Sequence, residues 1–453
     1  MNQHPKCQEW IERSQRVLAG GPATLSKLPS RYPQGIAPGV LSSCYGGVER
    51  RNGAYVTCPD GIRYVDLVAG LGPVILGHAD AAVTLAVMEQ AEHFACSTLS
   101  TPLECEVAEM LCDLIPGVEQ VRFACNGKDV TEAAVKVARH VTGRDHVIYC
   151  GYAGGFPDYL STTNKCGGVL PFLAEYNHQV PWRDFDAVEK VFGFMEVSLE
   201  RNDLAAIILE VPPEASGIEM NDTTATINRY KDMAHARGGL CILDEIVTGL
   251  RYAIGGAQEY YGVEADLITM SKALGNGLPI AAILGKRDLM QVFEGGRVFL
   301  STTFGASPIS LAAAKATLIE LQSSHGQRQL RTWGEALHRQ IVHAFQDCGL
   351  SATIRGNFAR MVIDWHDIPG VATAAELRTL WLQEMAKRNI LIGVPIFPMC
   401  CYDEGIVDDI LDAVSDSIPW MMVESRSQVL KRLEVPVIDE IFQRYVSVET
   451  PDV

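Results

Sequence analysis

Several motifs that commonly identify a binding site are missing from this sequence. Its 13 cysteines include no Cys-x-x-Cys pair, and its 11 histidines show no His-Glu-x-x-His spacing. We therefore expect reduced, structural cysteines and no metal site. The glycines of residues 71–78 do not follow the Gly-x-Gly-x-x-Gly spacing, so a dinucleotide site is not indicated.

Positive charge and long apolar runs are also scarce. The chain has 38 Lys and Arg residues against 55 Asp and Glu residues, a net charge of −17, which makes nucleic acid and anionic membrane poor general partners. No stretch reaches the roughly 18 apolar residues that a membrane span needs. Residues 1–10 also lack an apolar segment. We expect a cytoplasmic protein.

The composition that remains is that of a globular protein, with 47% hydrophobic and 21% charged residues in a chain of 453. Its periodicity predicts a helix at residues 8–18 and a hairpin that turns at residues 59–61. Helices at 81–94 and 102–114 have apolar stripes that we expect to lie in the core. Further strands and helices are expected at residues 352–365, 374–387, 391–397 and 407–418.

Two short apolar runs, residues 240–243 and 267–270, are typical of buried strands in a parallel sheet. A carboxylate pair, Asp244 and Glu245, follows the first run, and Lys272 follows the second. Ligands of such sheets bind beyond the carboxyl ends of the strands. We therefore expect Asp244 and Lys272 to face one crevice.

A carboxylate and an amine in one crevice suit the chemistry of pyridoxal phosphate. The amine of Lys272 can form a Schiff base with an aldehyde, and Asp244 can hold a pyridine nitrogen protonated. On spacing alone, another interpretation is equally compatible. Asp244 would then cap the next helix, and Lys272 would be a solvated surface charge.

Residues 121–139 have the pattern of a short strand, a polar turn and a helix. Asp129, with Glu132 three residues later, predicts a start that resembles a capping box. The backbone amides of Gly127 and Lys128 would then face an anion from the N-terminus of the helix. From the residues alone, a plain strand-to-helix turn is the stronger interpretation.

Three ordered segments, residues 243–251, 255–262 and 271–279, resemble the class III aminotransferases, which are fold type I pyridoxal phosphate enzymes. Within that class the chain is most similar to the glutamate-1-semialdehyde aminomutase group, over roughly residues 10–445. The stretch that begins at Asn126 resembles the Asn-Gly-Ser-Asp version of members linked to surface-sugar pathways, with Lys128 in place of serine.

The resemblance implies an α/β fold, with a large domain built on a mostly parallel seven-stranded sheet and a small α+β domain. It places an N-terminal segment at residues 1–65, the large cofactor-binding domain at 66–325 and the C-terminal small domain at 326–453. It also implies a homodimer in which the two subunits share their active sites.

The resemblance further implies a role for each candidate site residue. Lys272 would hold pyridoxal 5'-phosphate and transfer protons as general base and acid, and Asp244 would keep the ring nitrogen protonated. The remaining roles are ring stacking by Tyr152 and Ile246, phosphate binding by Asn126, Gly127, Lys128 and a partner subunit's Thr303, orientation of cofactor or substrate by Glu210, and substrate binding by Arg360.

Several of these residues also have simpler interpretations. Ile246 can be a core residue, Thr303 a turn or cap residue, and Glu210 a surface charge at a strand end. An arginine such as Arg360 suits a carboxylate or phosphate through its planar fork, but it can equally form a surface salt bridge.

The sequence departs from the family at positions that bear on the reaction. Ala153 stands where a histidine usually follows the stacking aromatic residue, and residues 24–31 lack the Ser-Pro-Val-Arg stretch of true aminomutases. We favour an aminotransferase-like or aminomutase-like enzyme for a small acidic or phosphorylated substrate, which Lys27, Arg31 and Lys128 permit. The alternatives are a pyridoxal phosphate-dependent decarboxylase or epimerase, and a catalytically silent homologue that acts by binding.

Overall fold

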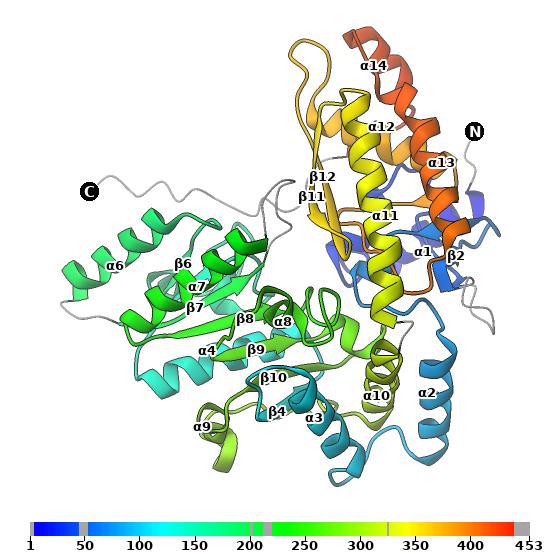
Figure 1. The fold of residues 1–453 in the computed structure, drawn as a ribbon. Helices are drawn as coiled ribbons and strands as arrows, with labels where there is room; N and C mark the ends of the chain where they lie inside the picture. The colour runs from blue at the N-terminus through cyan, green and yellow to red at the C-terminus, as the bar shows by residue number, and fades with distance from the viewer. Residues whose placement is uncertain (1–3, 45–52, 200–202, 212–219, 324–325, 439–453) are drawn as a thin grey trace. The chain divides into compact units, whose positions relative to one another are not determined.

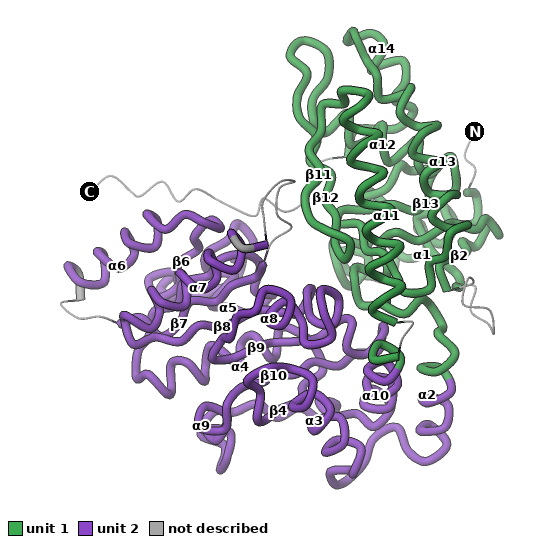
Figure 2. Tube along the Cα trace, in the orientation of Figure 1, with its two compact units in different colours: residues 1–84, 213–217, 320–441 green, residues 85–212, 218–319, 442–453 purple. Residues whose placement is uncertain are grey.

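The structure, a computed structural model, describes residues 4–44, 53–199, 203–211, 220–323 and 326–438 (Figure 1). The chain forms two compact units, and two of the boundaries between them fall within helices α2 and α10 (Figure 2). The domain limits expected at residues 65 and 325 stay a prediction. Unit 1 comprises residues 1–84, 213–217 and 320–441, and unit 2 comprises residues 85–212, 218–319 and 442–453.

Unit 2 is built on a seven-stranded sheet with the order β4-β10-β9-β8-β7-β5-β6. Neighbouring strands from β9 to β6 run parallel, whereas β10 is antiparallel to both of its neighbours. The expectation of a mostly parallel seven-stranded sheet is therefore confirmed. The strands are β4 (Gln120–Ala124), β5 (His146–Cys150), β6 (Asn177–Gln179), β7 (Leu204–Glu210), β8 (Leu240–Glu245), β9 (Leu267–Met270) and β10 (Ala281–Gly285).

The central strands of this sheet are buried along their whole length, because helices cover them. Helix α4 packs against β7 to β10, and α7 packs against β7 and β8. The described helices are α2 (Ala81–His93), α3 (Pro102–Leu114), α4 (Gly127–Thr142), α5 (Pro157–Leu160), α6 (Phe185–Leu199), α7 (Met220–Ala236), α8 (Gly256–Tyr261), α9 (Arg287–Met290) and α10 (Pro308–Gln322), with 3-10 helices η5 (Pro171–Glu175), η6 (Lys272–Gly275) and η7 (Gln291–Gly296).

Unit 1 contains a sheet with the order β1-β2-β3-β13 and a separate hairpin of β11 and β12. Helix α13 packs against both α11 and α12. The elements are α1 (Pro5–Val17), η1 (Leu25–Lys27), η2 (Pro29–Arg31), β1 (Ser43–Cys44), β2 (Tyr55–Thr57), β3 (Arg63–Asp66), η4 (Ala69–Leu71), α11 (Gly326–Asp347), β11 (Ala352–Asn357), β12 (Arg360–Trp365), α12 (Ala374–Lys387), β13 (Ile390–Leu391), α13 (Glu404–Met421) and α14 (Arg426–Arg432).

Two local expectations for unit 1 have different outcomes. The hairpin predicted around residues 59–61 is confirmed, since β2 pairs with β3 in antiparallel register. The regular element expected over residues 391–397 is not found at that length, because β13 ends at Leu391 and an isolated bridge at Ile396 follows. Pro395 lies between them and has no N–H to donate to a ladder.

The apolar stripes of α2 and α3 also differ. In α3, Val107 and Leu111 are buried as expected. In α2, Val83 is buried, but Leu85 is 65% exposed and Met88 is 60% exposed, so the expectation that this stripe lies in the core is wrong for a single chain.

Two further findings concern the whole described chain. Across the described residues, no helix has both the length and the apolar character to cross a membrane. All 13 cysteines lie at described positions and are free, and three of them, Cys96, Cys105 and Cys166, are exposed.

Candidate active site

The carboxyl ends of β8 and β9 form one edge of the sheet in unit 2. The two strands are parallel, with Asp244 in register with Thr269. Lys272 follows two residues after the end of β9. Asp244 and Lys272 therefore lie at the same sheet edge, where the sequence places them.

Asp244 is a buried carboxyl group, with only 3% of its surface exposed. Burial raises its pKa to about 7, and the neighbouring charge of Glu210 adds to the rise. The backbone N–H of Ile246, 3.0 Å from Oδ1, and the positive charge of Lys272 act in the opposite direction. A cationic donor placed against Asp244 would favour its ionised form.

The next residue along β8, Glu245, is also buried but has a different role. Successive side chains of a strand point to opposite faces of the sheet. Glu245 accepts hydrogen bonds from the backbone N–H groups of Ala257 at 2.6 Å and Gln258 at 2.8 Å, at the start of α8. The helix-capping role that was the alternative for Asp244 thus belongs to Glu245.

Lys272 has an unusual backbone conformation, with φ at 41°. Residues other than glycine are rare in this left-handed region, and such strain costs on the order of 1–3 kcal/mol and clusters at functional sites. The Ser271 hydroxyl donates a hydrogen bond to the Ile280 carbonyl at 2.8 Å and fixes the turn. Tertiary structure, rather than local preference, sets the position of this lysine.

Glu210 connects the end of β7 to the loop that follows β5. Its Oε2 accepts a hydrogen bond from the backbone N–H of Tyr152 at 2.9 Å. Gly151, with φ at 106°, permits this approach, because a Cβ there would lie 2.7 Å from the Glu210 Cβ. Glu210 is buried, so it is not the surface charge of the simpler interpretation.

Tyr152 is held beside the two carboxyl groups. Its ring packs edge-to-face on Tyr159, with centroids 5.6 Å apart, and 45% of its surface stays exposed. The pKa of Tyr152 is raised, mainly by partial burial and to a smaller extent by the negative charges of Glu210 and Asp244. No sequence pattern indicated Tyr159 as the residue that supports this ring.

Helix α4 begins at Gly127, with Asn126 as its N-cap residue. The capping-box start predicted at Asp129 and Glu132 is wrong, since Asp129 already lies in the first turn and donates its N–H to the Asn126 carbonyl at 3.1 Å. The first backbone N–H groups of a helix have no partner within the helix. Those of Gly127 and Lys128 therefore fit an anion at this position.

A glycine is required at the start of α4 because Ile246 packs against it. A Cβ on Gly127 would lie 2.7 Å from the Ile246 Cδ1. Ile246 is only two residues from Asp244, so this contact links the start of α4 to the end of β8. The structure brings Gly127, Tyr152, Glu210, Asp244, Ile246 and Lys272 together at one sheet edge.

Asn126 and Lys128 flank Gly127 at the start of α4. The last two candidates, Thr303 and Arg360, lie in other surroundings. Thr303 is exposed on a turn before α10, and a Cβ on the neighbouring Gly305 would lie 3.2 Å from the Phe123 carbonyl of β4. Arg360 is buried, and it belongs to β12 of unit 1.

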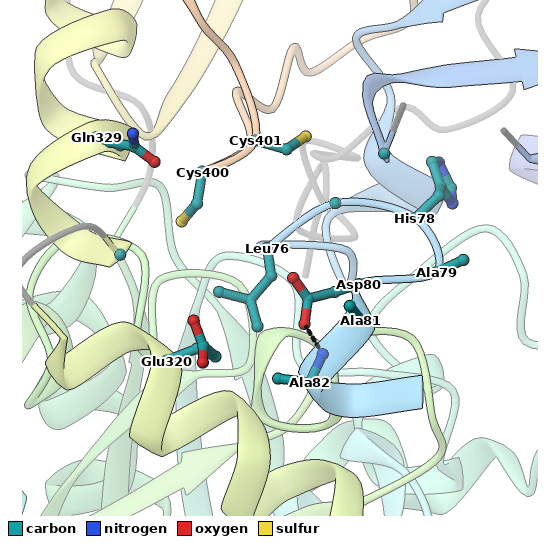
Figure 3. A pocket seen from close by; sticks show the side chains of 13 residues that line it. Leu76, His78, Ala79, Asp80, Ala81, Ala82, Glu320, Gln329, Cys400 and Cys401 are labelled. Carbon is teal, nitrogen blue, oxygen red and sulfur yellow. Dashed lines mark hydrogen bonds between the residues drawn. The ribbon is translucent and has the colours of Figure 1, made fainter. Parts of the chain in front are cut away.

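Unit 1 contains a separate cavity of about 210 Å³ (Figure 3). Leu76, Glu320, Cys400 and Cys401 line it, and Asp80 beside it accepts the Ala82 N–H at 3.1 Å. None of the candidate site residues lines this cavity, so it is not the candidate active site.

Comparison with known proteins agrees with this geometry. The family described as Aminotransferase class-III matches residues 42–416. The chain is 31% identical over 371 residues to glutamate-1-semialdehyde 2,1-aminomutase of Rhodopirellula baltica, covering 78% of this chain and 83% of the relative. It is 32% identical over 427 residues to that of Methanothrix thermoacetophila, covering 89% and 94%.

Solved structures share the fold at lower sequence identity. An omega-transaminase from Sphaerobacter thermophilus has a TM-score of 0.77 at 24% identity, covering 91% of this chain and 97% of that chain. A transaminase with PLP bound has a TM-score of 0.80 at 22% identity, covering 94% and 98%. With the family match over most of its length, the chain belongs to the class III aminotransferases, a family of pyridoxal phosphate-dependent enzymes.

Proposed function

We propose that this enzyme adds, removes or moves an amino group on a small acidic or phosphorylated substrate, with pyridoxal 5'-phosphate held at Lys272. One observation carries the proposal: a strained lysine and a buried carboxyl group lie at the same edge of the parallel sheet. When bound, the cofactor supplies an aldehyde that captures amines and a ring that accepts electrons.

Asp244 holds the proton of the ring nitrogen in this proposal. An isolated buried carboxyl group resists ionisation, and burial accordingly raises the pKa of Asp244 to about 7. A positively charged N–H against its oxygens stabilises the carboxylate. Asp244 would therefore keep the ring nitrogen protonated, which is the state that attracts electrons.

Lys272 binds the cofactor and transfers protons. The Ser271 turn fixes the backbone of Lys272 in the left-handed region. This restricts the directions from which the amine would approach the substrate. The Nζ of Lys272 would take a proton from the substrate carbon and return it to another position.

The other candidates bind the ring and the phosphate. Tyr152, held through Glu210, and Ile246, held against Gly127, would lie on the two faces of the ring. Asn126, Gly127 and Lys128 would bind the phosphate at the start of α4. We assign Arg360 to the substrate because its guanidinium suits a carboxylate or phosphate.

A homodimer with shared sites forms part of the proposal. Unit 2 exposes large apolar side chains at Leu85, Met88, Phe94, Leu99, Phe299 and Phe304, and a partner would cover such a surface. The Ser307 hydroxyl donates to the Ala95 carbonyl at 3.1 Å, which holds the turn that carries Thr303 near the residues after α2. Thr303 would then reach the phosphate in the partner's site.

We also propose that the enzyme works in the cytoplasm. All 13 cysteines are free, which suits a reducing compartment.

A dimeric mass in solution would support the proposed homodimer. A monomer that turns over substrate as fast as the dimer would contradict active sites shared between subunits.

Spectroscopy of the cofactor-loaded enzyme tests the reaction. An amino donor should convert the visible cofactor band to the shorter-wavelength aminated form, and a keto acceptor should restore it. Carbon dioxide release without that conversion would favour the decarboxylase. Racemisation without it would favour the epimerase, and failure to bind pyridoxal phosphate would favour a silent homologue.

A further inference from the structure

Four side chains with metal-binding atoms meet in unit 1, whereas the cofactor residues belong to unit 2. His4 and Cys7 come from the start of α1, and Cys58 and Asp60 come from the turn between β2 and β3. One nitrogen, two sulfurs and one carboxylate oxygen from these residues lie within 4.8 Å of one another. The two cysteines and the histidine are buried.

The imidazole of His4 is oriented with its Nδ1 toward the other three residues. Its Nε2 lies 2.9 Å from the Ile36 carbonyl and 3.0 Å from the Tyr64 hydroxyl. A carbonyl oxygen only accepts, so Nε2 carries the proton and Nδ1 has the lone pair in the neutral ring. Metal-binding histidines commonly use their second nitrogen in this way.

Asp60 is also held in place by its surroundings. Its Oδ1 accepts the backbone N–H of Lys6 at 2.8 Å, and its Oδ2 accepts that of Cys7 at 3.0 Å. Each carboxylate oxygen has more than one lone pair, so these bonds fix the group and still allow Oδ2 to bind a cation. The same bonds attach the hairpin turn to the first turn of α1.

The two distances from His4 Nδ1, to Cys58 and to Asp60, suit tetrahedral coordination. Zinc bonds of about 2.1 Å to nitrogen and about 2.3 Å to sulfur place those two ligand atoms about 3.6 Å apart in a tetrahedron. His4 Nδ1 and Cys58 Sγ are 3.6 Å apart, and His4 Nδ1 and Asp60 Oδ2 are 3.8 Å apart. Small side-chain shifts would complete the coordination.

We propose that His4, Cys7, Cys58 and Asp60 bind one zinc ion. Two sulfurs and an imidazole nitrogen favour zinc over the harder Mg²⁺ and Ca²⁺, which prefer oxygen. Both thiols release their protons to solvent on binding. With four protein ligands the site is closed, so the ion would stabilise the junction between α1 and the β2–β3 turn and take no part in catalysis.

The simpler explanation is that Asp60 only caps α1 and that the cysteines only fill the core. That explanation accounts for the bonds from Lys6 and Cys7, and for the weak 3.6 Å bonds of Cys7 Sγ to the Val40 carbonyl and of Cys58 Sγ to His4 Nδ1. It does not require all four ligand atoms to lie within 4.8 Å of one another. The sequence patterns did not indicate a metal site because the ligands form two separate pairs, His4-x-x-Cys7 and Cys58-x-Asp60, and neither pair is a known motif by itself.

Metal analysis of the full-length protein tests the proposal. The protein is incubated with zinc chloride, desalted and measured by plasma mass spectrometry. We expect one zinc ion per chain in the wild type, no zinc in Cys58→Ser, and full zinc in Cys348→Ser, a matched control at a half-buried cysteine of the same unit. Equal zinc in wild type and Cys58→Ser would overturn the site.

Cobalt(II) provides a second test that does not depend on any variant folding. In the wild type, difference spectra should show sulfur-to-cobalt charge transfer and the intense visible bands of tetrahedral cobalt, and zinc should bleach them. Absence of these bands would overturn the proposal. So would a Cys7–Cys58 disulfide, seen as two thiols fewer than 13 in the denatured protein purified without reductant. Neither outcome depends on pyridoxal phosphate.

Discussion

The carboxyl end of β8 presents two neighbouring carboxyl groups to two different environments. Asp244 and Glu245 are both buried, and burial raises the pKa of each to about 7. Glu245 accepts two backbone N–H groups from α8 and the Thr248 hydroxyl. Asp244 instead shares its surroundings with Glu210 and Lys272. At similar burial, the partners of a carboxyl group distinguish a structural role from a functional one.

The largest effect is expected at the lysine beside Asp244. Lys272→Ala removes the proposed cofactor attachment and the proton carrier, so kcat should fall by about 10⁴-fold or more. Lys286→Ala, a change at an exposed lysine, should leave kcat unchanged. Steady-state rates and the visible cofactor band measure both variants. Full activity in Lys272→Ala would show that another group carries the cofactor.

The next effect concerns the functional carboxyl group itself. Asp244→Asn keeps the shape but cannot hold the ring nitrogen protonated, so kcat should fall by about 10²-fold. The melting temperature of the cofactor-free protein should not fall, because the change replaces a carboxyl group that burial destabilises when ionised. A large loss of stability with unchanged kcat would give Asp244 a structural role like that of Glu245.

A smaller effect is expected where Ile246 meets the start of α4. Gly127→Ala places a Cβ 2.7 Å from the Ile246 Cδ1 and should weaken pyridoxal phosphate binding by about tenfold, equivalent to about 1.4 kcal/mol. Adding Ile246→Val removes Cδ1 and should restore part of the affinity. Cofactor titration gives both constants, and unchanged affinity in Gly127→Ala would argue against a phosphate at this helix start.

Substitution of Glu245, the structural carboxyl group, should lower stability rather than kcat, the reverse of Asp244→Asn. Glu245→Gln replaces an acceptor that faces Ala257 and Gln258 with a group that is half donor. The free energy of unfolding should therefore fall by about 1–3 kcal/mol, while kcat of the folded enzyme changes little. Urea unfolding measures the first quantity and steady-state kinetics the second. A loss of kcat as large as that of Asp244→Asn would remove the distinction between the two residues.

The last expected effect is a dependence of stability on pH. The folded-state pKa of Asp244, about 7, lies above the unfolded value of about 3.9. Between these values the folded state binds more protons than the unfolded state, so cofactor-free protein should lose stability as pH rises from 4 to 7. Asp244→Asn should reduce this slope, and so should bound cofactor. A slope unchanged in Asp244→Asn would contradict the assignment.

Sequence patterns predicted the parts of this site that follow from strand ends. Asp244 and Lys272 each follow a short apolar run, and parallel topology brings the ends of such strands to one edge. The predicted start of α4 was wrong because Asp129 has a local capping pattern. The observed start is at Gly127, which packs against Ile246. That contact joins residues far apart in the chain, and no local pattern contains it.

Other features could not be predicted because no local sequence pattern carries them. The apolar stripe of α2 suggests a core helix, yet Leu85 and Met88 are exposed in one chain. Glu245 and Asp244 are adjacent acidic residues with no sequence signal for their separate roles. Gly256, where a Cβ would lie 2.4 Å from the Glu245 Oε2, shows how closely α8 approaches the capping residue.

The most direct test of the central claim is to reduce the cofactor-loaded enzyme with borohydride and map the modified peptide by mass spectrometry. We predict that the visible band disappears and that the phosphopyridoxyl label is found on Lys272. A label on another lysine in an enzyme that stays active until reduction would contradict the assignment of this sheet edge as the active site.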